Sequence, residues 1–140
     1  MQEYENAKFI YEQWHERAKS RDVDALLELY SNDAVFESPL VMAILDDKKD
    51  GILRGKAEIR RFLEAGTKKR PNELVKWYRN GKFLTDGSLL VWEYPRQTPD
   101  GEQIDILELM ELKGRSIVYH RIYWGFKGCM QIAGSLVKNS

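Results

Sequence analysis

The chain has 140 residues, enough for one domain with a hydrophobic core, and 43% of them are hydrophobic, which excludes a disordered chain. Lys and Arg number 22, as do Asp and Glu, so the formal net charge is zero. This balance argues against nucleic acid as the main partner, because phosphate binding needs a basic surplus. The single cysteine, Cys129, excludes an internal disulfide and indicates a reducing compartment.

The first residues, MQEYENAKFI, lack the basic region and apolar run of a signal peptide. The longest apolar run, PLVMAIL at 39–45, is too short to span a membrane. We therefore expect a soluble cytoplasmic protein with no membrane partner.

Two helices are predicted at the start of the chain. Apolar residues recur at three- and four-residue steps and indicate a helix over residues 3–20. The members of this stripe are Ala7, Ile10, Tyr11, Trp14 and Ala18. His15 is expected at the solvent edge of that helix. Asp22 is a good N-cap for a second helix. The buried face of the second helix is predicted to hold Leu26, Leu27 and Tyr30.

A short strand and a third helix follow. AVFES at 34–38 has strand composition and is stopped by Pro39. Residues 40–54 are expected to form a loop or flap, and DDKKDG within them lacks the ligand pattern of a calcium loop. GKAEIRRFLEAG at 55–66 predicts a helix that Gly66 ends. Its inward residues are Ile59, Phe62 and Leu63.

The rest of the chain has strand composition, except for a C-terminal tail at 127–140. The predicted strands are LVKWYRNGKFL, SLLVWEY, QIDILELMEL and SIVYHRIYWGF, separated by turn residues. Helices followed by a run of strands indicate one α+β domain over residues 1–140. We expect a curved, mainly antiparallel sheet with three helices on its concave face and an apolar pocket between them.

The stretches RDVDALLELYSNDAVFESP, GKAEIRRFL and GRSIVYHRIYWG resemble the nuclear transport factor two-like superfamily, in its SnoaL-like and ketosteroid isomerase-like branch. The resemblance covers most of the chain apart from residues 40–52 and those after about 127. It implies a cone-shaped fold with an internal pocket and pairing of two copies through the outer sheet face. It does not fix the activity, because one fold hosts many chemistries.

The resemblance places the base of the ketosteroid isomerases at Ser38, their tyrosine at Trp14 and their sheet acid at Glu108. Serine is not a useful base near neutral pH and indole cannot ionise, so steroid isomerisation by the usual residues is not expected. In the epoxide hydrolase branch an aspartate stands where this chain has Ile122, so that reaction is not expected either.

His120 lies within the last predicted strand, where alternate residues share a face. Val118, His120, Ile122, Trp124 and Phe126 form the more apolar face, which the resemblance turns toward the pocket. A three-residue hairpin loop at 113–115 would set Glu108 opposite His120, and we favour it because it keeps the apolar faces together. A two-residue loop at 113–114 would set Glu108 opposite Tyr119 instead.

The candidate catalytic pair is therefore His120 as acid and base with Glu108 as its partner. The expected ligand contacts are Trp14, Phe36, Ser38, Phe62, Trp92, Glu93, Ile106, Met110, Ile122 and Trp124. Whether Trp92 or Glu93 points inward is left open by the sequence. Tyr119, Arg121 and Tyr123 lie on the opposite face, where a homodimer is expected. No metal or cofactor is expected.

Three functions remain open from the sequence. The first is a small-molecule-binding domain for a lipophilic, polyketide- or steroid-like ligand, with proton-transfer chemistry of the isomerase, cyclase or dehydratase kind. The second is a non-catalytic binder or sensor, and the third is a protein-interaction module of the same fold.

Overall fold

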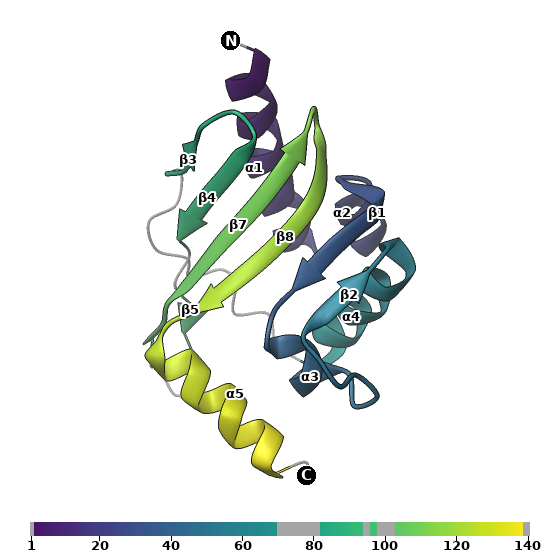
Figure 1. Cartoon of the computed structure of the whole chain (residues 1–140), viewed down its shortest axis with the longest axis vertical. Helices are drawn as coiled ribbons and strands as arrows, with labels where there is room; N and C mark the ends of the chain where they lie inside the picture. Colours follow the sequence, from purple (N-terminus) through teal and green to yellow (C-terminus); the bar gives the residue numbers. More distant parts are fainter. Residues whose placement is uncertain (1, 70–81, 94–95, 98–102, 139–140) are drawn as a thin grey trace.

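A computed structural model shows a mixed sheet with helices on one face (Figure 1). It describes residues 2–69, 82–93, 96–97 and 103–138. The six-stranded sheet has the order β2-β1-β8-β7-β4-β3, and a separate two-stranded ribbon pairs β5 with β6. Within the described residues, the β1–β8 pair is parallel and the other pairs are antiparallel. The expected α+β class is confirmed.

The strand bounds are as follows: β1 Tyr30–Glu37, β2 Ile52–Arg54, β3 Leu84–Thr85, β4 Leu89–Glu93, β5 Arg96–Gln97, β6 Gln103–Ile104, β7 Ile106–Lys113 and β8 Ser116–Trp124. The helix bounds are α1 Gln2–Ser20, α2 Val23–Leu27, α3 Leu40–Ile44, α4 Lys56–Lys69 and α5 Phe126–Lys138. None of the described helices is long and apolar enough to cross a membrane.

Helix α1 packs through the predicted stripe, with Ala7, Ile10, Tyr11 and Trp14 buried. It ends in a Schellman motif, in which Arg21 N–H donates to Ala18 O and Asp22 N–H donates to Arg17 O, each at 3.2 Å. Asp22 then caps α2, as predicted, because its side chain accepts a hydrogen bond from the Ala25 N–H at 3.0 Å. The turn between α1 and α2 is therefore fixed on both sides.

Strand β1 begins earlier than the sequence pattern indicated. Tyr30 was expected on the second helix, but α2 ends at Leu27 and Tyr30 is the first residue of β1. Tyr30, Ala34 and Phe36 are buried on one face of β1, with a register shift between Tyr30 and Val35 in the pairing with β8. Pairing with two neighbouring strands overrides the helical pattern of LLELY.

The predicted loop or flap at 40–54 is wrong in its first and last parts. Leu40–Ile44 forms α3, which buries Val41 and Ile44, and Ile52–Arg54 forms β2 on the edge of the sheet. Pro39 suits the start of this helix because proline lacks the N–H that a first turn leaves unbonded. These residues are packed parts of the domain.

Three other boundaries differ from the prediction. The expected tail at 127–140 is a helix, α5, and strand β8 ends at Trp124 rather than at Phe126. Helix α4 continues past Gly66 to Lys69. The predicted strand QIDILELMEL is divided at Asp105 into β6 and β7. Most of the predicted strand LVKWYRNGKFL lies outside the described residues.

The hairpin of β7 and β8 has neither of the two registers considered from the sequence. Its turn is Gly114–Arg115, with Gly114 at a φ of +61°, and Lys113 pairs with Ser116. A bulge at Val118 then shifts the ladder, so Met110 lies opposite His120 and Glu108 lies opposite Ile122. The bulge also turns Ile117 inward in place of Val118. Glu108 and His120 still share the concave face, as neighbours along a diagonal of the sheet.

His15 is half-buried, which corrects its expected place at the solvent edge. Its ring lies 4.3 Å from the Tyr11 ring and 5.1 Å from the Trp92 ring, and Nδ1 bonds to the Tyr11 carbonyl oxygen at 2.7 Å. A carbonyl only accepts, so Nδ1 carries a proton. Burial lowers the pKa of His15 from 6.5 to about 4, more than the hydrogen bond to Tyr11 raises it.

Removing the Asp22 side chain, which caps α2, should destabilise the turn between α1 and α2. We expect Asp22→Ala to lower the free energy of unfolding by about 1 kcal/mol, because the Ala25 N–H loses its acceptor. Urea denaturation measures the change. Asp46→Ala, which removes an exposed carboxylate outside this turn, is the control. Equal stabilities of Asp22→Ala and the wild type would contradict the role of the cap.

The lowered pKa of His15 makes stability depend on pH. The unfolded chain takes up a proton on this ring below about pH 6.5, whereas the folded chain does so only near pH 4. This contribution is therefore complete above pH 6.5 and is lost as the pH falls to 4. Against His15→Phe, wild type should lose about 2 kcal/mol of unfolding free energy across that window. Urea denaturation at pH 7.5 and 4 measures it, and parallel profiles for the two proteins would refute it.

Candidate functional site

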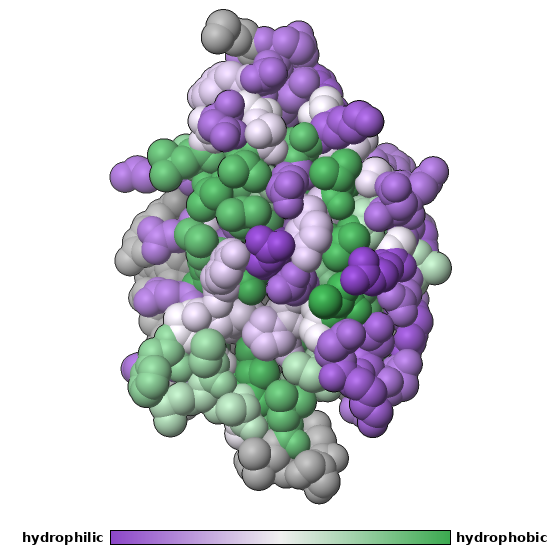
Figure 2. All heavy atoms as spheres, in the orientation of Figure 1, coloured by the Kyte–Doolittle hydropathy of each residue, from purple (hydrophilic) through white to green (hydrophobic). Residues whose placement is uncertain are grey.

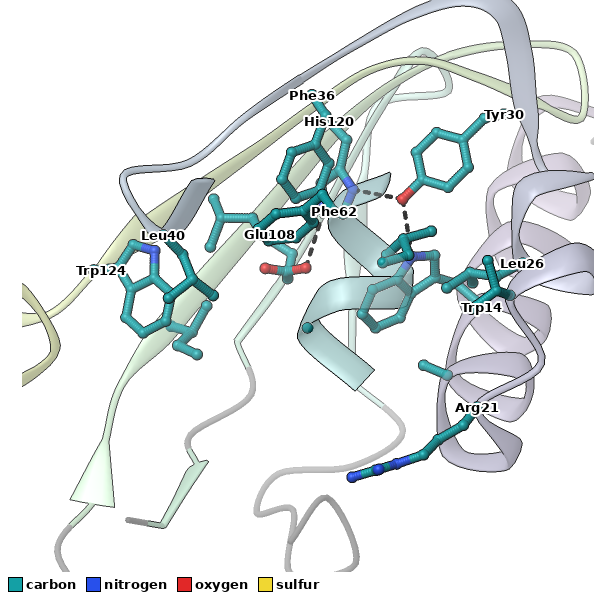
Figure 3. A pocket seen from close by; sticks show the side chains of 16 residues that line it. Trp14, Arg21, Leu26, Tyr30, Phe36, Leu40, Phe62, Glu108, His120 and Trp124 are labelled. Atoms are coloured by element: carbon teal, nitrogen blue, oxygen red, sulfur yellow. Dashed lines mark hydrogen bonds and ion pairs between the residues drawn. The ribbon is translucent and has the colours of Figure 1, made fainter. Parts of the chain in front are cut away.

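A cavity of about 120 Å³ lies between the concave face of the sheet and helices α1, α2 and α4 (Figure 3). Eight of the residues predicted from the sequence line it. The apolar members of this set are Trp14, Phe36, Phe62, Ile106, Ile122 and Trp124. Its polar members are Glu108 and His120, both fully buried. The cavity thus has a largely apolar wall with a small polar group at its floor.

The polar residues form one hydrogen-bonded chain (Figure 3). His120 Nε2 lies 2.9 Å from Glu108 Oε1, and His120 Nδ1 lies 2.8 Å from the Tyr30 hydroxyl. Trp14 Nε1–H donates to the same hydroxyl at 3.3 Å. Four elements, α1, β1, β7 and β8, each supply one member, so the chain of bonds forms only when the sheet and α1 are assembled.

One donor in this network is fixed by its chemistry. Indole nitrogen only donates, so the Tyr30 oxygen accepts from Trp14 Nε1–H. The two contacts of His120 depend on its tautomer. With the proton on Nε2, His120 accepts from the Tyr30 O–H at Nδ1 and donates to Glu108 Oε1.

The second carboxylate oxygen of Glu108, Oε2, differs from Oε1 in its hydrogen bonding. Oε2 is buried and has no hydrogen-bond partner among the described residues. A buried carboxylate oxygen without a donor is costly, because it has lost its contact with water. Since Glu108 lines the cavity, a bound molecule can bring the missing donor to this oxygen.

Four predicted ligand contacts do not line the cavity. Ser38 is buried beside it, where its Oγ accepts from Trp124 Nε1 at 3.2 Å and from the Leu40 N–H at 3.1 Å. Ser38 therefore holds the orientation of Trp124. Met110 is buried within the sheet opposite His120.

The choice between Trp92 and Glu93 is settled by burial. Trp92 is the inward residue of β4 and packs 5.4 Å from the Trp14 ring, and Glu93 is exposed. Neither lines this cavity; both border a second, more open hollow of about 260 Å³ that Phe83 also lines.

Sequence reasoning missed several residues of the cavity. Tyr30 was placed on a helix, so its link to His120 was not foreseen, although the alternation of Tyr30, Ala34 and Phe36 was a usable strand signal. Leu40 was expected in a flap. Arg21, in the turn after α1, gave no local signal at all, because only the fold brings it to the cavity.

The outer sheet face carries a compact polar cluster. Tyr119 O–H donates to Glu37 Oε2 at 2.5 Å, and the Arg121 guanidinium lies 4.6 Å from the Tyr119 ring centre and 3.4 Å from the Tyr123 hydroxyl. Figure 2 shows hydrophilic side chains at the centre of this face, with apolar side chains around them. The homodimer through this face stays a prediction.

The described residues contain no group of three or more His, Cys, Asp or Glu that could hold a metal ion.

Solved structures of similar shape support the architecture. A SnoaL-like protein of unknown function from Burkholderia thailandensis is 18% identical with a TM-score of 0.66, covering 86% of this chain and 95% of the other. SalBIII, an epoxide hydrolase/cyclase-like enzyme in pyran ring formation of the polyether salinomycin, is 18% identical with a TM-score of 0.60, covering 91% and 96%. TerC, crystallised with polyporic acid, is 14% identical with a TM-score of 0.68, covering 91% and 97%. At these identities the likeness concerns the fold.

No curated protein matches the chain at a significant level. The SnoaL-like domain, in contrast, matches residues 11–120, which include every member of the Trp14–Tyr30–His120–Glu108 network. Since that match covers well over half of the chain, this protein belongs to the SnoaL-like domain family.

Proposed function

We propose that this protein catalyses cofactor-independent proton transfer on a small lipophilic carbonyl compound, in the manner of an isomerase, cyclase or dehydratase. The observation that carries the proposal is Glu108 Oε2, a buried carboxylate oxygen in the cavity without a hydrogen-bond partner among the described residues. A structural carboxylate would be expected to have both oxygens bonded. One oxygen held by His120 and the other left for a ligand is the arrangement that a general base needs.

The proposed roles use the tautomer in which His120 Nε2–H donates to an ionised Glu108. Glu108 Oε2 takes a proton from a carbon next to the substrate carbonyl, and the electrons of that C–H bond move into an enolate. Returning the proton to another carbon isomerises the compound. Expulsion of an oxygen substituent from the carbon β to the carbonyl gives elimination, and the departing oxygen takes the proton that Glu108 holds. In the reverse direction, Glu108 takes the proton of a substrate hydroxyl as its oxygen adds to the β carbon of an enone, and it returns that proton to the α carbon to complete ring closure. His120 does not take the proton in this scheme; it positions Glu108 through Oε1, and Tyr30 fixes the His120 tautomer.

The size and character of the cavity limit the ligand. An apolar cavity of about 150 Å³ holds a benzene molecule. At about 120 Å³, this cavity has room for no more than one ring of a substrate. A steroid or polyketide would have one ring enclosed and the remainder outside. The fold neighbours SalBIII, called epoxide hydrolase/cyclase-like, and TerC, crystallised with polyporic acid, support a small-molecule role for such a cavity.

The energetic coupling of Glu108 and His120 can be measured by a double-mutant cycle. His120→Leu leaves the buried carboxylate unpaired and should lower the free energy of unfolding by about 3–5 kcal/mol. Glu108→Leu should cost less, because it leaves a neutral N–H without an acceptor. The double variant should be more stable than the sum of both losses by about 2 kcal/mol. Urea denaturation measures all four proteins, with Met110→Leu as the control outside the network, and additive losses would contradict the buried pair.

The proposed chemistry can be tested by hydrogen exchange on simple ketones. The protein should accelerate the exchange of α-hydrogens for deuterium in cyclohexanone, 2-cyclohexenone or 2-tetralone, followed by proton NMR in D₂O. Glu108→Gln keeps the hydrogen bond from His120 but removes the base, so the rate should fall about 10²–10³-fold. The control is Glu111→Gln, on the exposed face of the same strand.

Two outcomes would count against catalysis. Equal exchange rates for wild type and Glu108→Gln would show that Glu108 is not the base. Saturable binding of the ketones without exchange would favour the second candidate, a non-catalytic binder that uses Glu108 Oε2 only to accept a hydrogen bond.

A further inference from the structure

We infer that the substrate of this cavity is an anion, a one-ring ketone with a carboxylate group, and that Arg21 is the residue that selects it. The inference rests on the proposed function, because it assigns the two ends of the same ligand. The ketone end lies at Glu108 on the floor, and the carboxylate end lies at Arg21.

The charges that line the cavity are arranged by depth. Among the described lining residues, Arg21 is the one with a permanent positive charge and Glu108 is the one acid. Glu108 and His120 are fully buried, whereas Arg21 is half-buried at the end of α1. Figure 3 shows the Arg21 side chain extending from the end of α1 beneath Trp14, with its guanidinium well below the Glu108 carboxylate in this view. A ligand that contacts both groups would carry a hydrogen donor or acidic C–H at its deep end and a negative charge at its outer end.

The backbone at Arg21 gives an independent reason to assign it a function. Arg21 has a φ of +57° and is the one described residue other than glycine with a positive φ. It occupies the position of the Schellman motif in which glycine is strongly preferred, since a side chain is strained there. Asp22 fixes the same turn by capping α2, so the conformation at Arg21 is imposed on it. An arginine at this position costs stability, and a role in binding offsets that cost.

Guanidinium suits this role because its planar fork binds both oxygens of a carboxylate. A partly exposed site also suits recognition better than chemistry. The carboxylate can keep part of its hydration there, while the apolar ring enters the cavity between Trp14, Phe62 and Trp124. Arg21 is thus a specificity-determining residue, and Glu108 is the catalytic one.

The test uses a matched pair of probes, 4-oxocyclohexanecarboxylate and its neutral methyl ester. Binding is measured by NMR titration, and proton transfer is measured by α-hydrogen exchange in D₂O. Wild type should bind the acid at least about tenfold more tightly than the ester. Added salt should weaken the binding of the acid and leave the binding of the ester unaffected. Arg21→Gly should remove this preference and raise the Tm by a few degrees. Arg21→Lys should retain part of the preference. Arg54→Gln, which removes an exposed arginine outside the cavity, should behave as wild type.

The outcomes separate this inference from the proposed function. If wild type prefers the acid and Arg21→Gly does not, the inference stands even when neither probe exchanges, and only the catalytic proposal fails. If both probes exchange through Glu108 but bind equally in wild type and Arg21→Gly, the proposed function stands and the inference is overturned. Failure of wild type to bind the acid also overturns it.

Discussion

A carboxylate buried in an apolar cavity is the constraint on which the rest of the structure depends. Glu108 is fully buried and would be strongly destabilising without a partner. His120 supplies that partner, Tyr30 holds His120 from the other side, and Trp14 bonds to Tyr30. Because these residues come from α1, β1, β7 and β8, the polar network fixes the relative position of the first helix and the central strands.

The bulge in β8 is what makes this network geometrically possible. Without it, the ladder that starts from the Gly114–Arg115 turn would set Ile117 and His120 on opposite faces, since they lie three residues apart. With Val118 as the extra residue, both point inward. Bulges often redirect a side chain beside a functional site, and here the bulge directs His120.

The interior of the domain is incompletely filled, which lowers the stability of the fold. A cavity with an apolar wall forgoes packing contacts, and the unbonded Glu108 oxygen forgoes a hydrogen bond. The remaining core compensates, with the aromatic cluster of Tyr11, Trp14, His15 and Trp92 closing the side of the cavity toward α1 and β4. Ser38 orients Trp124 at the other end. Two residues that line the cavity, Trp14 and Trp124, are thus held by neighbours that do not line it.

The sequence by itself determined the α+β class, the first helix and its buried stripe, and the Asp22 cap, and it left open whether Glu108 and His120 share a face. The determined features follow from local periodicity and cap chemistry, which act over a few residues. Only the tertiary structure decided that LVMAI is a helix, that Tyr30 belongs to a strand, that β8 is bulged and that Arg21 reaches the cavity. Each of those depends on pairing or packing between segments far apart in the chain, where long-range contacts outweigh the local preferences that a sequence pattern records.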